Sequence, residues 1–209
     1  MASSDTRGQL LDAAEHLFAE RGFRGTSIRA ITDRAGANLA AVGYHFGSKA
    51  ELMAAVVRRV VEPITAAQCA GLDTLLARTP DPPVSELVEA FAGPLFDEMP
   101  DGDEGGARTS RLIVTILSDP AEEARSWTGP AEDTVRERYF AAFARVLPGL
   151  SPEELWFRMR GILAVTAVDR LQVHQQPSPG CVSPVAGEAA RRWAITFLTA
   201  AMSAPPIQP

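Results

Sequence analysis

The chain has 209 residues, of which 46% are hydrophobic and 22% are charged, a composition typical of a globular protein with one sizeable core or two small ones. No apolar run reaches the roughly 18 residues that a membrane-spanning helix needs, and the first residues lack a basic-then-apolar signal pattern, so we expect a soluble cytoplasmic protein. The formal net charge of −6 argues by itself against nucleic acid and anionic membranes as partners.

The charge is divided unevenly along the chain. Residues 1–60 contain eight basic and six acidic residues, a net charge of +2, whereas the remainder has twelve basic and twenty acidic residues and a net charge of −8. A basic head, residues 1–60, therefore precedes an acidic body, the remaining residues. For the head, the charge no longer argues against nucleic acid as a partner. Two cysteines are too few for a zinc site without other ligands, and we expect neither a metal nor a cofactor.

The first three predicted helices are short and punctuated by capping residues. Apolar positions in residues 6–22 recur with the 3.6-residue period of an amphipathic helix, and Gly22 is a candidate C-cap. Ser27 is a candidate N-cap for a second helix that ends at Gly36, and Asn38 is a candidate N-cap for a third. The stripe expected to face inward on the third helix consists of Leu39, Val42 and Phe46.

The remaining segments also have helical patterns. Ser48 and Glu51 form an S-x-x-E capping box that starts a long fourth helix, at about residues 48–78, in which Pro63 predicts a kink. Further helices are predicted at residues 84–99, 105–118, 131–147, 152–174 and 185–203. Because no alternating pattern of strand type occurs, the sequence predicts an all-α fold of about nine helices.

The second and third helices have the spacing of a helix-turn-helix. The turn at residues 35–38 contains Gly36, a residue that can adopt a left-handed conformation. The face of the third helix opposite its inward stripe can enter a major groove, although three helices packed as a plain subdomain are the alternative interpretation. That outward face consists of Ala37, Ala40, Ala41, Gly43 and Tyr44.

The N-terminal part of the chain resembles the DNA-binding domain of the TetR family of bacterial transcription regulators. The resemblance covers about residues 6–60 without gaps and rests on the stretch TRGQLLDAAEHLFAERGFRGTSIRAITDRAGANLAAVGYHFGSKAEL. It implies a helix-turn-helix domain over residues 1–50, linked through the fourth helix to an effector-binding and dimerisation domain over residues 51–209. The implied function is a homodimeric repressor that binds a pseudo-palindromic operator and is released by a small molecule.

Other interpretations have less support. An activator or a ligand-independent regulator of the same fold has the same sequence features, because the difference lies in the operator position and the effector. An enzyme is a remote alternative, since the chain contains no G-x-S-x-G elbow, no H-E-x-x-H motif and no paired-carboxylate constellation.

Ten residues are predicted to contact DNA. Ser27 can donate to a phosphate at a helix N-terminus, and Arg29 can bind guanine or a phosphate. The resemblance implies that Tyr44 contacts the backbone or a thymine methyl group, and that His45 and Lys49 contact phosphates. The full set is Ser27, Arg29, Asn38, Leu39, Ala40, Ala41, Gly43, Tyr44, His45 and Lys49.

The chain also departs from the family pattern on the third helix. Leu39, Ala40 and Ala41 stand where family members often carry Lys, Ser or Thr, and Gly43 replaces a residue that is usually Tyr or polar. Few hydrogen-bonding groups are therefore left to read bases. We expect Arg29 and Asn38 to supply hydrogen bonds, the alanines to meet thymine methyl groups, and DNA shape to add specificity.

The last two predicted helices are each apolar on two sides, which indicates that something besides their own core covers them. The resemblance implies a second subunit, whereas burial in one large monomer core is the alternative. The predicted dimer residues are Phe157, Gly161, Ala164, Val168, Leu171, Ile195, Leu198 and Met202. Apolar residues of the middle helices are candidates for an effector pocket, with plain core packing as the alternative. They are Phe91, Phe96, Met99, Ile113, Leu117, Trp127, Trp156 and Met159.

Overall fold

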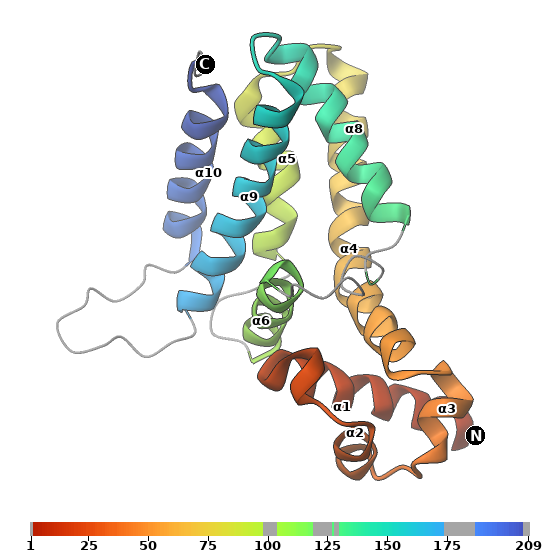
Figure 1. Ribbon diagram of the computed structural model, residues 1–209. Coiled ribbons are helices and arrows are strands. Elements are labelled where there is room, and N and C mark those ends of the chain that lie inside the picture. The colour runs from red at the N-terminus through yellow and green to blue at the C-terminus, as the bar shows by residue number, and fades with distance from the viewer. Residues whose placement is uncertain (1, 98–103, 119–126, 128–129, 174–186, 207–209) are drawn as a thin grey trace, which may run out of the picture. The chain divides into compact units, whose positions relative to one another are not determined.

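The computed structural model describes residues 2–97, 104–118, 127, 130–173 and 187–206. These residues form nine α-helices and include no β-strand, so the predicted all-helical fold is confirmed (Figure 1). Within the same ranges, no helix has the length and apolar character needed to cross a membrane. The helices are α1 (Ala2–Gly25), α2 (Ile28–Ala35), α3 (Ala40–Phe46), α4 (Lys49–Arg78), α5 (Val84–Asp97), α6 (Glu104–Ser118), α8 (Pro130–Val146), α9 (Pro152–Val173) and α10 (Gly187–Ser203).

The first helix, α1, is interrupted where the sequence predicts a stop. Gly22 has φ 69° and ψ 176°, a conformation that residues with a side chain rarely adopt, and a short helical segment follows it to Gly25. The Thr26 hydroxyl group lies within hydrogen-bonding distance of the carbonyl oxygens of Leu17, at 3.0 Å, and Gly22, at 2.8 Å. These contacts of a buried threonine fix the turn that leads into α2.

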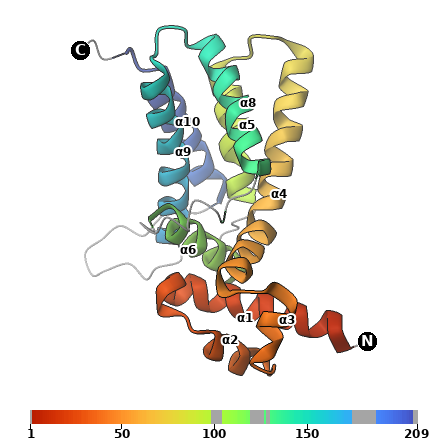
Figure 2. The same cartoon turned by 45° about the vertical axis from the view of Figure 1, so that its right-hand side comes forward.

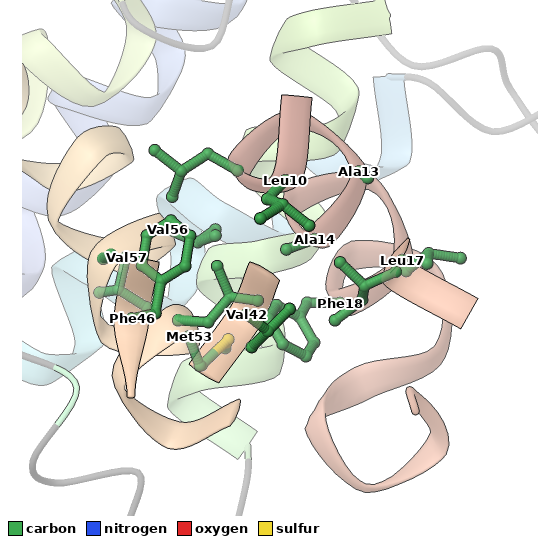
Figure 3. Close-up of a cluster of buried hydrophobic side chains, with 14 of the residues drawn as sticks. Leu10, Ala13, Ala14, Leu17, Phe18, Val42, Phe46, Met53, Val56 and Val57 are labelled. Carbon is green, nitrogen blue, oxygen red and sulfur yellow. The ribbon is translucent and has the colours of Figure 1, made fainter. Parts of the chain in front are cut away.

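Apolar side chains of α1, α3 and the beginning of α4 meet in one buried cluster. Figure 3 shows residues of the three helices pointing toward one another around Phe18 and Val42. Full burial of a Leu or Phe side chain contributes about 1.5–3 kcal/mol to folding, so this cluster stabilises the head of the chain. The labelled members are Leu10, Ala13, Ala14, Leu17, Phe18, Val42, Phe46, Met53, Val56 and Val57.

An ion-pair network fastens α4 to α1 at the edge of this cluster. The Arg59 guanidinium group donates to Asp12 at 2.7 Å and also to Glu15. Burial opposes the charge of Arg59, but the hydrogen bonds to Glu15 and Asp12 outweigh it and raise the pKa of the guanidinium group. One guanidinium group thereby pairs with two acidic residues of the head, of which Asp12 is exposed and Glu15 is largely buried.

The chain divides into two compact units. The first consists of Met1–Glu62 with Arg111–Gly129, and the second of Pro63–Ser110 with Pro130–Pro209. The first unit extends beyond residue 50, where the sequence places the domain boundary, and its buried core includes Leu112 and Trp127. Helices α4 and α6 both continue across the division.

The second unit is built around α5, α8, α9 and α10, which run side by side in both views (Figures 1 and 2). Its buried core includes the Tyr139 side chain, whose hydroxyl group donates to the Gln68 carbonyl oxygen at 2.9 Å. The Gln68 side chain in turn donates to the Phe91 carbonyl oxygen at 2.7 Å. Burial raises the pKa of Tyr139 well above its usual value, which keeps this hydroxyl group a donor.

Candidate nucleic-acid interface

The turn between α2 and α3 has the geometry of a helix-turn-helix. Gly36 adopts φ 62° and ψ 28°, the left-handed conformation that ends α2, and its N–H group donates to the Asp33 carbonyl oxygen. The Ala37 N–H group donates to the Thr32 carbonyl oxygen at 2.9 Å, which closes the turn. The predicted stop at Gly36 is confirmed, and it sets where α3 begins.

Side-chain caps start both short helices. The Ala30 N–H group donates to Ser27 Oγ at 3.1 Å, and the Ala40 N–H group donates to Asn38 Oδ1 at 2.9 Å, so both predicted N-caps are confirmed. In each cap the side-chain oxygen is the acceptor. The exposed Ser27 hydroxyl group can therefore still donate its hydrogen, whereas Asn38 Oδ1 already accepts one hydrogen bond before any base approaches.

The outer face of α3 is small and apolar except at its end. Tyr44 is 82% exposed, Leu39 is 59% exposed, and Ala40 and Gly43 are also exposed. A Cβ atom added at Gly43 would meet no atom within 4 Å, and its φ is not positive, so neither space nor backbone geometry requires glycine there. We name this exposed surface of Leu39, Ala40, Gly43 and Tyr44 the reading face.

Two details of the predicted faces of this helix are wrong. Leu39 was expected to point inward, but it precedes the first residue of α3 and is exposed, while only Val42 and Phe46 are buried. Ala37 and Ala41 were expected on the outward face, but both are half-buried against the core of the head. The side chains that pack against the core here are therefore those of Ala37 and Ala41 rather than that of Leu39.

Arg29 and His45 lie at opposite ends of the helix-turn-helix. The Arg29 side chain is almost fully exposed, and its Nε lies 3.9 Å from the carboxylate of Asp33, one helical turn further on. A pair this exposed is worth little, so the guanidinium group is available to another anion. The half-buried His45 ring meets the Tyr44 ring edge to face, with 4.9 Å between centroids.

Lys49 is the first residue of α4 and the single lysine in the sequence. The Glu51 N–H group donates to Ser48 Oγ at 3.1 Å, so the predicted cap is confirmed. The Lys49 ammonium nitrogen lies 4.3 Å from the centroid of the Phe23 ring. Burial lowers the pKa of Lys49. A cation at a helix N-terminus adds to the positive end of the helix dipole, an arrangement suited to a phosphate.

Sequence reasoning missed two residues of this region. The exposed Arg7 guanidinium group lies over the Phe46 ring, 5.1 Å from its centroid, which brings a further cation to the end of α3. The Phe23 ring contacts the Lys49 ammonium group, which places an aromatic side chain against this cation. No spacing rule links positions 7 and 46 or 23 and 49, because only the fold brings them together.

The residues expected around an effector lie in both units. Phe91, Phe96 and Met159 are buried in the core of the second unit, where Trp156 stacks on the Phe140 ring at 4.7 Å. Trp127 is buried in the core of the first unit against Phe23, a role different from the predicted pocket wall. The other three are Ile113, in the first unit, Leu117, on α6, and Met99, which lies outside the described residues. The pocket stays a prediction.

The predicted dimer face is exposed on α9 but not on α10. Phe157 is 69% exposed, Ala164 is exposed, and the space around Gly161 is open. Val168 and Leu171 lie further along α9. On α10, however, Leu198 and Met202 are buried in the protomer's own core, and Ile195 is half-buried against it. The α10 part of the prediction is therefore corrected. Both faces of this helix are apolar, and the face with Leu198 and Met202 packs into the protomer's own core.

A different face of α10 is exposed instead. Trp193 and Phe197 are 63% and 58% exposed. Phe197 and Phe157 line an apolar groove between α9 and α10 with a volume of about 540 Å³. At its edge the Arg158 guanidinium group donates to the carbonyl oxygens of Ala201, at 3.1 Å, and of Met202, at 2.8 Å. We name the surface of Phe157, Gly161, Ala164, Trp193 and Phe197 the aromatic face.

These features define an all-helical protein whose N-terminal unit carries a helix-turn-helix with an exposed reading face and cations beside it. The comparison with protein families then identifies it: the chain belongs to the tetR family of bacterial regulatory proteins. Residues 10–56 match the family model described as bacterial regulatory proteins, tetR family. Residues 89–201, more than half of the chain, match the model described as Tetracyclin repressor-like, C-terminal domain. The resemblance inferred from the sequence is confirmed.

Two curated relatives each match less than half of the chain. The chain is 37% identical over 89 residues to the HTH-type transcriptional repressor KstR2 of Mycobacterium tuberculosis, which covers 43% of this chain and 36% of that protein. It is 39% identical over 89 residues to the HTH-type transcriptional activator FasR of Mycolicibacterium smegmatis, which covers 42% of this chain and 39% of that protein. The matches thus span well under half of the length of these relatives.

Solved structures support the fold over almost the whole chain. The TetR family transcriptional regulator PfmR from Thermus thermophilus has a TM-score of 0.58 at 20% identity, and the match covers 97% of both chains. The multidrug binding protein EbrR complexed with malachite green has a TM-score of 0.58 at 23% identity, with 95% of this chain and 98% of that chain covered. At these identities the likeness establishes the fold alone.

Proposed function

We propose that the protein is a homodimeric transcriptional repressor that binds a pseudo-palindromic operator and leaves it when a small molecule binds. The observation that carries the proposal is the exposed reading face of α3, flanked by the exposed Arg29 and by Lys49, in a head of net charge +2. The acidic body, with a net charge of −8, is suited to stay off DNA. Such a regulator acts in the cytoplasm, where its operator lies.

In this proposal, the ten predicted residues divide into two kinds of contact. Ser27, His45 and Lys49 bind phosphates and set the position of the head on the duplex. Arg29 supplies the strongest base contact, a bidentate pair with guanine, because its guanidinium group is exposed and weakly paired. Tyr44, Leu39 and Ala40 on the reading face meet apolar base edges such as thymine methyl groups, and the half-buried Ala41 adds only the part of its methyl group that remains exposed. Gly43 lets the backbone of α3 approach the groove closely.

Asn38 is assigned a limited role. Its Oδ1 accepts the capping hydrogen bond from Ala40, so a bidentate contact with adenine has to share that oxygen. Its amide nitrogen can donate to an acceptor on a base edge or to a phosphate. We therefore rank Asn38 below Arg29 as a source of base specificity.

The aromatic face is our proposed dimer interface. Phe157, Trp193 and Phe197 expose three aromatic side chains beside an apolar groove. Such a cluster is unusual on the water-exposed surface of a protein and is typical of a contact between subunits. Gly161 and Ala164 are small enough for two helices to approach closely. A twofold dimer through this face pairs two helix-turn-helix heads, which is the symmetry that a pseudo-palindromic operator requires.

Release by a small molecule is the regulatory part of the proposal. The domain proposed over residues 51–209 supplies the effector site, and the domain proposed over residues 1–50 supplies the DNA contacts. Helix α4 connects the two domains and contains Pro63. Because proline has no N–H group, the Arg59 carbonyl oxygen lacks its usual helical hydrogen bond. In this proposal, bending of α4 at Pro63 lets movement in the body change the spacing of the two heads. If the substitution Pro63→Ala leaves the effect of an effector on operator affinity unchanged, Pro63 has no such role.

An activator of the same fold is the second candidate, and one observation favours it. The relative FasR is named a transcriptional activator, at about the same identity as the repressor KstR2. The position of the operator discriminates between the two functions. A site that overlaps a promoter supports repression, whereas a site upstream of a promoter supports activation.

Selection of bound DNA from a random pool tests the proposed function. The expected result is enrichment of one sequence made of two inverted half-sites, because two identical heads contact it. Enrichment of no sequence would contradict DNA recognition. Enrichment of a single half-site would contradict the dimer while leaving recognition intact.

A further inference from the structure

We propose that Phe23, supported by Trp127, is a positioning residue that holds the Lys49 ammonium group in place for a DNA phosphate. The inference rests on the proposed function, because it concerns how the head contacts the DNA backbone. It adds to that function two aromatic residues that touch no DNA themselves, and it gives Trp127, from a distant part of the first unit, a role in DNA binding.

Three side chains from distant parts of the sequence contact one another in a row in the first unit. The Lys49 ammonium nitrogen lies 4.3 Å from the centroid of the Phe23 ring. The Phe23 ring packs in turn on Trp127, with 4.9 Å between centroids and an interplanar angle of 52°. Trp127 is 1% exposed and belongs to the buried core of the first unit, so this row of contacts is anchored at its inner end.

The backbone holds Phe23 in place as well. The break at Gly22 turns the chain immediately before Phe23, and the Thr26 hydroxyl group ties the following residues back to Gly22 and Leu17. The Phe18 ring lies further from Phe23 than Trp127 does, at 6.0 Å between centroids, so the close support comes from Trp127. The Phe23 ring is therefore a fixed platform rather than a mobile surface side chain.

The Lys49 ammonium group contacts an aromatic ring, whereas Arg29 and Arg59 of the head lie near carboxylates. Arg59 pairs with Asp12 and Glu15, and Arg29 lies near Asp33. Among the described residues, no carboxylate lies within 4.0 Å of the Lys49 ammonium group, which faces the ring instead. An aromatic ring attracts the cation without neutralising it, so the full charge remains for a phosphate. The ring covers one side of the ammonium group, which has three N–H donors.

Holding the cation in advance favours DNA binding in two ways. A lysine side chain is long and flexible, and a phosphate contact normally costs the ordering of that side chain. The ring has already ordered the side chain in the free protein. Burial also lowers the pKa of Lys49, which indicates that part of its hydration is lost before DNA arrives.

A double-mutant cycle with Phe23→Leu and Lys49→Ala tests the proposal by DNA affinity. Phe23→Leu keeps an apolar side chain but removes the ring, and we expect it to weaken binding roughly three- to tenfold. We expect no further loss when Phe23→Leu is added to Lys49→Ala, because the ring acts through the lysine. Equal losses in both backgrounds, or binding that is unchanged or tighter in Phe23→Leu, would overturn the proposal.

Phe18→Leu is the matched control for a lost core ring. Phe18 is fully buried in the same cluster, and no cation of the described residues lies over its ring. The Phe18→Leu variant should lose at least as much thermal stability as Phe23→Leu, but its DNA affinity should stay near that of the unmodified protein. If it weakens binding as much as Phe23→Leu does, the effect comes from core stability and the proposal fails.

A second readout does not depend on DNA. Because the chain has one lysine, protein labelled with ¹³C-lysine gives a single ε-methylene signal in an untagged sample. We expect that signal to be shifted upfield by the ring current, and the shift to disappear in Phe23→Leu and to persist in Phe18→Leu. Absence of the shift refutes the placement of Lys49. A shift in a protein that binds no DNA refutes the proposed function and, with it, the phosphate role.

Discussion

At the residue scale, Arg29 and Lys49 are predicted to contribute differently to DNA binding. Arg29→Ala should relax specificity, because it removes the exposed guanidinium group that can form a bidentate pair with guanine. Lys49→Ala should weaken binding to all sequences and reduce the slope of log affinity against log salt by about 1, because it removes one phosphate contact. Fluorescence anisotropy with the selected site and a scrambled site, at several salt concentrations, measures both effects.

Comparison of Arg29→Ala with Lys49→Ala distinguishes a contact with a base from a contact with a phosphate. Arg34→Ala provides a control, because Arg34 is an exposed arginine on α2 outside the predicted contact set. If Lys49→Ala leaves both the affinity and the salt slope unchanged, Lys49 contacts no phosphate. If Arg29→Ala weakens the selected and scrambled sites equally, Arg29 binds the backbone rather than a base.

Gly43 allows a prediction about stability. An alanine Cβ at this position meets no atom within 4 Å, so Gly43→Ala should raise the free energy of unfolding by about 0.8–1 kcal/mol, the difference between the two residues in a helix. Chemical denaturation monitored by circular dichroism measures this. DNA affinity should fall in the same variant, because the added methyl group lies where α3 approaches the groove. A variant that is more stable and binds DNA unchanged would show that close approach at residue 43 is not needed.

The caps could be predicted from the sequence, whereas the exposure of Leu39 could not. Ser27, Asn38 and Ser48 bond to backbone N–H groups two or three residues further on, so the decisive interaction is local. Gly22 and Gly36 likewise meet local backbone requirements. Whether Leu39 is buried depends on what the preceding turn places against the core, and the helical period contains no information about that.

At the element scale, the C-terminal end of α10 depends on Arg158. This nearly buried guanidinium group donates to carbonyl oxygens of Ala201, Met202 and Ala204 and to Glu154. Arg158→Ala should lower the free energy of unfolding by about 1.5–3 kcal/mol, the usual range for hydrogen bonds with a charged partner. Arg160→Ala, at an exposed position of the same helix, should change it by less than about 0.5 kcal/mol. Thermal unfolding curves that shift equally for both variants would contradict this role.

Helix positions were easier to predict than helix faces. The five helices from α5 to α10 begin and end within a few residues of their predicted limits, because proline and glycine clusters separate them. On α10, however, Trp193 and Phe197 are as apolar as Leu198 and Met202, so the pattern did not show which pair faces the core. Trp127 illustrates the same limit over a longer distance. Its partner Phe23 lies more than one hundred residues earlier in the sequence.

At the scale of the whole molecule, the aromatic face should hold two subunits together. Phe197→Glu places a charge on this exposed apolar surface and should convert the dimer to a monomer without unfolding it. Arg192→Glu places the same side chain at an exposed position elsewhere on α10 and should leave the dimer intact. Sedimentation velocity gives the mass of each variant, and circular dichroism checks its folding. A Phe197→Glu variant that stays dimeric would show that the interface lies elsewhere.

Dimerisation also has to supply much of the operator affinity. The head carries a net charge of only +2, so one head alone gains little from neutralising phosphates. Two linked heads bind two half-sites together, which raises the affinity without new contacts. The monomeric Phe197→Glu variant should therefore lose most specific binding even though its reading face is unchanged.

The mass of the complex between the protein and its selected DNA site tests the central claim most directly. Light scattering coupled to size-exclusion chromatography gives this mass, from which the number of chains bound to one duplex follows. The account predicts two chains, or a multiple of two, on a duplex with two inverted half-sites, and loss of the complex when one half-site is scrambled. A complex of one chain with one duplex, equally stable on a single half-site, would contradict the account.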